Sequence, residues 1–113
     1  MALDPDAIRR GTVVSIRLPR DKARSAVVVR SDLLRTLPYA TILPITSELR
    51  EGIDLMPGPE NGLRVPSQVM VHWSQTVRLS DMGQVIGQPP PAIMQAIMRQ
   101  MAVVLGIGAS RPR

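Results

Sequence analysis

The sequence predicts a mainly β fold of the α+β type, a small β-barrel followed by one C-terminal helix. Two observations support this prediction: at least five short apolar runs separated by turn residues, and one long stretch near the C-terminus with helical periodicity. A chain of 113 residues suffices for one domain with a single modest core. We place this domain at residues 9–107, with flexible termini at 1–8 and 108–113.

Three strands are predicted in the first half of the chain. Residues 11–18 alternate between two faces, and residues 26–29 are a continuous apolar run of the buried-strand type. Residues 40–45 form the third strand, where Pro44 favours an edge or a strand end. Between the second and third strands, segment 31–35 opens with residues that cap one helical turn.

The middle of the chain contains more turn residues. Residues 48–64 are rich in Gly, Pro and acidic side chains, so we expect a long loop with a short strand around 53–56. Residues 69–73 and 76–79 are β-branched and apolar, and they form either two further strands or one bent strand.

The terminal helix follows three prolines at 89–91, where a missing N–H does no harm because the first turn of a helix leaves it unpaired. Apolar residues then recur at i, i+3, i+4 and i+7 until Gly106, which is suited to end a helix. One face carries a stripe of Met94, Met98 and Met101. We expect this stripe to pack on the sheet rather than to form a partner-binding groove.

Composition excludes several classes of protein. The sequence has no cysteine and one histidine, so it has no disulfide framework and no thiolate metal site, and a structural zinc centre is not expected. No apolar run approaches the length of a membrane span, and the first residues lack the apolar region of a signal peptide. We expect a cytoplasmic protein.

Positive charge is concentrated in the first third of the chain. The net charge is +5, and residues 9–35 hold eight basic side chains against Asp21 and Asp32. Such a segment attracts polyanions, of which RNA and DNA are the obvious examples. An acidic protein partner would satisfy the same field, and surface arginines that only maintain solubility would give the same count.

Polar side chains lie at the ends of two predicted strands. Arg24 precedes the run at 26–29, and Thr46 and Ser47 follow the strand at 40–45. If these strands are antiparallel neighbours, a guanidinium and two hydroxyls meet at one rim of the sheet, which suits a phosphate group. Taken alone, Arg24 is more typical of a surface arginine before a strand, and Thr46-Ser47 of a turn.

The same residues belong to an ordered series of motifs: Arg10-Gly-Thr-Val-Val14, Arg24-Ser-Ala-Val-Val-Val29, Pro44-Ile-Thr-Ser47, Val65-Pro-Ser-Gln-Val-Met-Val71, Thr76-Val77, Ile86-Gly87 and a helix closing at Leu105-Gly106. In this order, over about residues 9–107, the sequence resembles the MazF/PemK toxins of toxin–antitoxin systems. It departs from the family at Ser25, where proline is usual, and around His72-Trp73.

The resemblance implies an SH3-like barrel with a C-terminal helix, assembled as a homodimer. It also implies a metal-independent endoribonuclease without a cofactor, which cuts single-stranded RNA at short sequences and is restrained by a cognate antitoxin protein. In that chemistry the 2′-hydroxyl of the substrate attacks the adjacent phosphorus and leaves a cyclic phosphate and a 5′-hydroxyl, so no protein nucleophile is required.

The resemblance assigns the catalytic roles to Arg24, which would stabilise charge on the phosphorane, and to Thr46, which would orient the phosphate or the 2′-hydroxyl. An ungapped alignment sets His72 where many relatives carry an aspartate, and imidazole can replace a carboxylate as acid or base. A second register matches Ser74-Gln75 to the Asp-Gln of the family and leaves His72 without a role. The RNA-binding residues expected from charge and motif are Arg10, Arg17, Arg20, Lys22, Ser47 and Arg78.

The aromatic side chains of the sequence are Tyr39 and Trp73, which are the platforms available for stacking an unpaired base. We expect Trp73 to be buried in the dimer interface. Two alternatives remain open: a CcdB-like poison of DNA gyrase that shares the barrel, and a catalytically weakened member that binds RNA or antitoxin without cutting.

Overall fold

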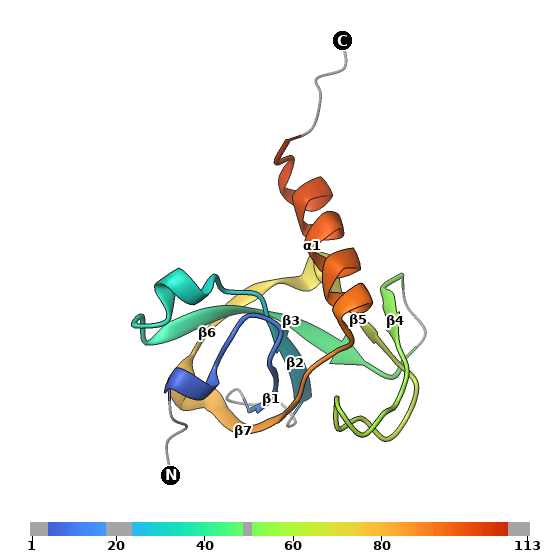
Figure 1. Cartoon of the computed structure of the whole chain (residues 1–113), viewed down its shortest axis with the longest axis horizontal. Coiled ribbons are helices and arrows are strands. Elements are labelled where there is room, and N and C mark those ends of the chain that lie inside the picture. The colour runs from blue at the N-terminus through green and yellow to red at the C-terminus, as the bar shows by residue number, and fades with distance from the viewer. Residues whose placement is uncertain (1–4, 18–23, 49–50, 109–113) are drawn as a thin grey trace.

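The computed structural model describes residues 5–17, 24–48 and 51–108. The described residues form seven strands, one α-helix and four short 3-10 turns (Figure 1). The strands are β1 (Val13–Ile16), β2 (Arg24–Val28), β3 (Tyr39–Thr46), β4 (Ile53–Leu55), β5 (Ser67–Val69), β6 (Gln75–Arg78) and β7 (Met82–Gly87). The helix is α1 (Pro91–Leu105), and the 3-10 turns are η1 (Pro5–Ala7), η2 (Asp32–Leu34), η3 (Val71–Trp73) and η4 (Leu79–Asp81).

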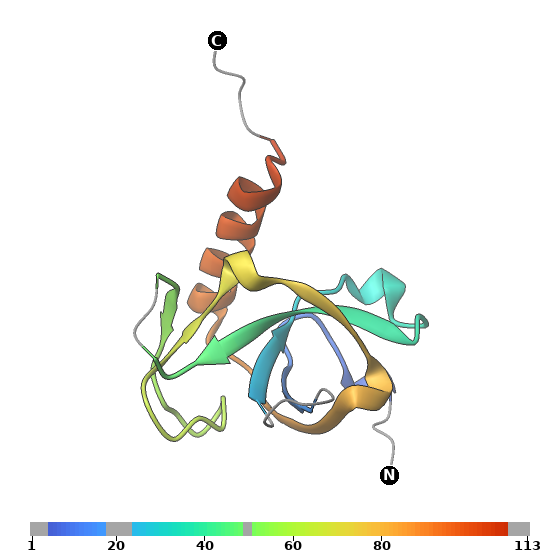
Figure 2. The same cartoon turned by 180° about the vertical axis from the view of Figure 1, so that it is seen from behind.

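The seven strands form one antiparallel sheet in the order β4-β5-β3-β2-β1-β7, with β6 paired to β3 as well. The sheet curls so that β6, β3, β2, β1 and β7 follow one another around a ring, and α1 rises from one end of it (Figures 1 and 2). The predicted small barrel with a C-terminal helix is confirmed. Strand β7, however, had no counterpart among the strands assigned from the sequence.

Both faces of the curled sheet are buried. Alternate residues of β1 lie in different clusters, since Val14 and Ile16 pack with Ala26, Val28 and Ile42 on one face. Val13, Val27, Leu43, Val69 and Ile97 form the other cluster, under the helix. The prediction of a single core is therefore wrong: the chain buries one cluster inside the ring and a second between the sheet and α1, because a curled sheet has two faces to cover.

The helix begins at Pro91 and ends at Gly106, whose left-handed conformation (φ 73°) closes the last turn as expected. Ile97 is fully buried, and the methionine stripe at 94, 98 and 101 packs against the second cluster, which confirms its structural role. The final turn projects beyond the sheet (Figure 1), and Leu105 there is 60% exposed. No helix among the described residues has the length and apolarity required to traverse a bilayer.

Pro44 lies in the central strand rather than at an edge, which corrects the expectation from the sequence. It pairs with Ala26 of β2, and its carbonyl accepts a hydrogen bond of 2.9 Å from the N–H of Met70. Along this side of β3, pairing with β6 ends at Ile42 and pairing with β5 begins at Ile45. The nitrogen of Pro44 faces the gap between the two pairings, so no ladder bond is lost.

The segment around His72 and Trp73 is a 3-10 turn and not a strand. Strand β5 ends at Val69, η3 follows, and the chain re-enters the sheet as β6 at Gln75. Both side chains are exposed as a result, and Trp73 is 47% exposed. The β-branched composition predicted a strand here, but the two pairings with β3 leave residues 70–74 opposite only Leu43 and Pro44. The extra residues cannot all stay in the ladder, so they leave it as the turn η3.

The loop between β4 and β5 is organised by one buried side chain, Asn61, which is 1% exposed. Its Oδ1 accepts hydrogen bonds from the backbone N–H groups of Gly58 (3.2 Å) and Leu63 (3.0 Å), and its Nδ2 donates to the carbonyl of Met56 at 2.8 Å. The backbone of Glu60 also accepts a hydrogen bond of 2.7 Å from Gln88, which attaches the loop to the end of β7. The predicted loop is therefore ordered by its own polar contacts.

Replacing Asn61 with alanine is expected to lower the free energy of unfolding by roughly 2–4 kcal/mol, because buried backbone groups lose their partners. Urea denaturation followed by circular dichroism measures this loss. Gln95→Ala, on the exposed side of α1, is the control and should change stability by less than about 0.5 kcal/mol. Equal stability of Asn61→Ala and the control would show that the loop does not depend on Asn61.

Candidate functional site

The pairing of β2 with β3 brings Arg24 and Thr46 to the same place. The two strands are antiparallel, with Ser25 opposite Ile45 and Ala26 opposite Pro44. Continued by one residue, this register sets Arg24 opposite Thr46 at the end of the sheet. Side chains at opposite positions project from the same face with Cβ atoms about 5 Å apart. The pairing therefore places Arg24 and Thr46 at one rim of the sheet, as the sequence predicts.

Arg24 and Thr46 line a common cavity of about 470 Å³. Its walls come from the start of β2, the end of β3 and the loop before β5. The lining residues are Arg24, Ser25, Ile45, Thr46, Ser47, Glu48, Gly62, Leu63, Arg64, Val65 and Ser67. We call this the Arg24 cavity.

A tight turn after β3 fixes the hydroxyl of Thr46. The Oγ1 atom of Thr46 accepts a hydrogen bond of 3.1 Å from the backbone N–H of Glu48, two residues further along. This is the local bond that threonine commonly makes in turns. Since the oxygen accepts this bond, the hydroxyl hydrogen of Thr46 remains for donation to a ligand oxygen.

The loop held by Asn61 forms the opposite wall and brings a second cation to the cavity. Leu63, whose N–H donates to Asn61, and the next residue, Arg64, both line the cavity. Ser67 closes the wall, and its Oγ donates a hydrogen bond of 3.0 Å to the carbonyl of Val65. Arg64 was not predicted from the sequence, because the 48–64 segment lacks any periodic pattern that would place its residues in space.

Among the described residues, the charged groups that line the Arg24 cavity are the guanidiniums of Arg24 and Arg64 and the carboxylate of Glu48. Hydroxyl groups of Thr46 and three serines add to this polar lining. Guanidinium donors present a planar fork that matches the oxygens of a phosphate. These donors therefore suit the oxygens of a phosphate group.

His72 does not line the Arg24 cavity of its own chain. It lies on η3, in the link between β5 and β6, and η3 contacts α1 and β3. The structure thus brings together two of the three predicted catalytic residues and separates the third. The catalytic roles themselves stay predictions.

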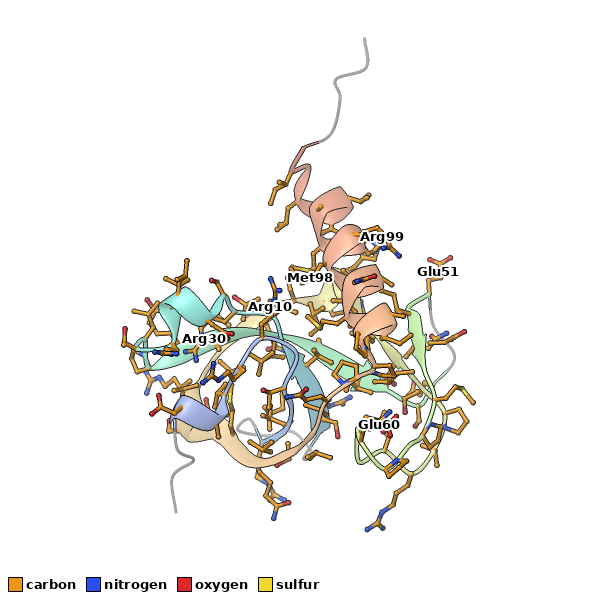
Figure 3. All side chains as sticks on the ribbon, in the orientation of Figure 1. Arg10, Arg30, Glu51, Glu60, Met98 and Arg99 are labelled. Atoms are coloured by element: carbon orange, nitrogen blue, oxygen red, sulfur yellow. The ribbon has the colours of Figure 1, made fainter. Side chains whose placement is uncertain are left out.

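The other predicted RNA-binding residues are distributed over the surface. Ser47 lines the Arg24 cavity. Arg10 lines a second cavity of about 540 Å³ together with Met98 and Arg99 of α1, and Figure 3 shows Arg10 near the helix that carries them. Arg17 follows β1 and its N–H donates a 3.0 Å hydrogen bond to the carbonyl of Asp81.

Arg78 lies at the other end of β3 from Thr46, opposite Tyr39 across the β3–β6 pairing. Both line a cavity of about 720 Å³ that also includes Arg35. Tyr39 is 46% exposed, so a stacking platform in a cavity with two guanidiniums is available there. Arg20 and Lys22 lie outside the described residues.

One arginine of the basic segment, Arg30, is buried and bonded to the backbone. Arg30 is 6% exposed, and its guanidinium donates to the carbonyls of Leu37 (3.0 Å), Tyr39 (3.2 Å) and Ile8 (3.3 Å). It therefore attaches the start of the chain to the segment before β3, which indicates a structural role for this member of the basic segment.

In the part of the chain that the structure describes, no group of three His, Asp or Glu side chains is arranged to hold a metal ion.

Residues 9–105 match the family model described as the PemK-like, MazF-like toxin of type II toxin–antitoxin systems. No curated protein matches the sequence at a significant level.

Several solved structures share the fold. The Mycobacterium tuberculosis toxin MazF-mt6 is 24% identical, with a TM-score of 0.75, and the alignment covers 87% of this chain and 99% of that one. An endoribonuclease in complex with its cognate antitoxin, from a mycobacterial species, is 20% identical with a TM-score of 0.71 and coverages of 90% and 96%. MazE–MazF from Deinococcus radiodurans is 13% identical, with a TM-score of 0.71 and coverages of 88% and 97%.

Inorganic phosphate is expected to bind in the Arg24 cavity with a dissociation constant on the order of millimolar, because a few charge-assisted hydrogen bonds at an open site give an affinity of that size. In an NMR titration, the amide signals of Thr46, Ser47 and Glu48 should shift most, and added salt should weaken the effect. Larger shifts at His72 and Trp73 than at these three residues would contradict this assignment.

Proposed function

This chain belongs to the family of PemK-like, MazF-like toxins of type II toxin–antitoxin systems, and on that premise we propose that it is a sequence-selective endoribonuclease. The substrate is single-stranded RNA, including mRNA, and the reaction needs neither a metal ion nor another cofactor. The observation that carries the proposal is the Arg24 cavity, in which Arg24 and Thr46 converge from two paired strands.

The proposed reaction begins with the 2′-hydroxyl of the RNA itself. This oxygen attacks the adjacent phosphorus, the bond to the 5′-oxygen of the next nucleotide breaks, and the products are a 2′,3′-cyclic phosphate and a 5′-hydroxyl. Negative charge accumulates on the non-bridging oxygens as the phosphorane forms. Arg24 stabilises that charge, because its guanidinium is permanently ionised and offers two donors in one plane.

Thr46 and Ser47 position the phosphate. The turn that holds Thr46 Oγ1 against the N–H of Glu48 orients the threonine hydroxyl before the substrate arrives. A donor fixed in advance does not have to be reorganised during the reaction, so its stabilisation is fully available in the transition state. Ser47, on the same turn, supplies a further phosphate contact.

Outside the Arg24 cavity, RNA is held by the basic residues Arg10, Arg17 and Arg78, with Arg20 and Lys22 of the connection between β1 and β2. Tyr39, next to Arg78 across two paired strands, stacks on an unpaired base. The contacts to phosphate give affinity, whereas the shapes of the cavities at both ends of β3 select the sequence.

We further propose that the protein acts as a cytoplasmic homodimer held inactive by an antitoxin. The last turn of α1 supports contact with a second copy, because Val103 and Leu105 are 70% and 60% exposed and Ile107, just beyond it, is 65% exposed. Trp73 on η3, which is packed beside α1, belongs to the same proposed interface. His72 remains a candidate acid or base for a site shared between the two copies. An acidic antitoxin segment would compete with RNA for the basic surface.

The purified protein is expected to cleave a long RNA of defined sequence in the presence of EDTA. Arg24→Ala should lower kcat by about 10²–10³-fold, since one fixed donor to the developing charge is lost. Product ends are identified by mass spectrometry, and the folded state of the variant is checked by circular dichroism.

Arg9→Ala is the matched control, because Arg9 is an exposed arginine that lines none of the three cavities described above. It should cleave at a rate within about twofold of the unmodified protein. Full activity of a folded Arg24→Ala variant would remove Arg24 from the mechanism. Gyrase-linked DNA breaks without RNA cleavage would show that the protein is a gyrase poison and not a ribonuclease.

A further inference from the structure

The proposed reaction needs a proton acceptor for the 2′-hydroxyl, and most residues of the Arg24 cavity are unsuited to this task. Arg24 and Arg64 carry guanidiniums that have no acceptor atom and do not lose their proton in proteins. The hydroxyls of Thr46 and of the serines are very weak bases without a partner that takes their proton. His72, the acceptor expected from the sequence, lies outside this cavity in its own chain.

Glu48 is the carboxylate among the described residues that line the Arg24 cavity. Glutamate side chains are ionised near neutral pH and accept protons through either oxygen. Its position follows from the turn after β3, in which the N–H of Glu48 is bonded to Thr46 Oγ1 at 3.1 Å. Glu48, which would receive the proton, is therefore hydrogen-bonded through its backbone N–H to Thr46, which orients the phosphate.

The other charged residues that line this cavity, among those that the structure describes, come from two other elements. Arg24 is at the start of β2 and Arg64 is in the loop before β5, and both line the same cavity. These two cations attract the phosphate of the RNA into the cavity that contains the carboxylate. The proton acceptor and the groups that stabilise the phosphorane are thus arranged around one space, as an in-line attack requires.

We propose that Glu48 is the general base of the reaction, a role that rests on the proposed ribonuclease function. The Glu48 carboxylate takes the proton of the 2′-hydroxyl while the 2′-oxygen forms its bond to phosphorus. The bond between phosphorus and the 5′-oxygen then breaks, and the leaving oxygen takes a proton from water. Transfer of the proton from Glu48 to the hydroxide so formed restores the ionised carboxylate.

This assignment separates two residues that the sequence does not distinguish. Glu48 follows Thr46-Ser47 in a segment with further acidic residues, and Glu51 is only three positions away. Glu51 is exposed and does not line the Arg24 cavity, and Figure 3 shows it at the outer tip of the segment that leads to β4. The neighbouring carboxylate is therefore a matched control.

The test compares Glu48→Gln, Glu48→Ala and Glu51→Gln on an oligodeoxynucleotide that carries one ribonucleotide at a cleavage site mapped on long RNA. Glu48→Gln should lower kcat by about 10²–10⁴-fold with KM changed by less than about threefold, because a base acts in the chemical step. Added formate should restore part of the activity of Glu48→Ala, since it supplies a carboxylate to the vacated space. Glu51→Gln should cleave at the rate of the unmodified protein.

The pH profile gives a further readout that a structural role would not change. The rate of the unmodified protein should fall in acid as the base takes up a proton, and Glu48→Gln should lack this fall. All variants are first shown to be folded by thermal unfolding. Binding of the same oligonucleotide with a 2′-deoxy sugar at the cleavage site should be unchanged or tighter in Glu48→Gln, because a negative charge near the phosphate is removed.

Two results would overturn the assignment while leaving the ribonuclease proposal intact. One is cleavage with cyclic phosphate ends at an undiminished kcat in folded Glu48→Gln. The other is a loss confined to KM without rescue by formate, which would make Glu48 a positioning residue. No cleavage by the unmodified protein on any tested RNA would instead remove the ribonuclease function, and the role of Glu48 with it.

Discussion

The antiparallel pairing of β2 with β3 is the constraint on which the site depends. Its register sets Arg24 opposite Thr46 at one end of the sheet. A slip of one residue would turn Arg24 to the other face, because side chains alternate along a strand. Burial prevents this slip: Val27 and Val28 lie in different apolar clusters, and both are fully buried. The two apolar clusters therefore fix the register that places Arg24 and Thr46 at the same end of the sheet.

The second half of the site depends on a loop rather than on the sheet. Asn61 organises the segment between β4 and β5 through three hydrogen bonds, and this segment supplies Arg64 to the cavity. A buried amide can hold a loop in one conformation because its donors and acceptors are satisfied only there. Catalysis of the proposed kind would use this rigidity, since a preorganised cation stabilises the phosphorane without first having to move.

The positions of the basic residues indicate that some of them support the fold and others form binding surfaces. Arg30 is buried and bonded to backbone carbonyls, so it supports the fold. Arg24 and Arg64 converge on one cavity, whereas Arg10 and Arg78 lie at two others. A count of positive charges along the sequence treats these residues alike, although their surroundings give them different functions. Such a surface is consistent with a polymer that is contacted at several separated points.

The sequence alone determined the features that arise from local pattern. The limits of α1 follow from Pro91 and Gly106, and the meeting of Arg24 with Thr46 follows from two apolar runs that neighbour each other in the chain. Tertiary structure decided what depends on contacts between distant segments. It placed Arg64 and Glu48 in the cavity, moved His72 onto a 3-10 turn, and put Pro44 in a central strand at a gap in the pairing. Periodicity records which side of an element is apolar, whereas the approach of a loop to a sheet edge is set by hydrogen bonds and packing that no local pattern encodes.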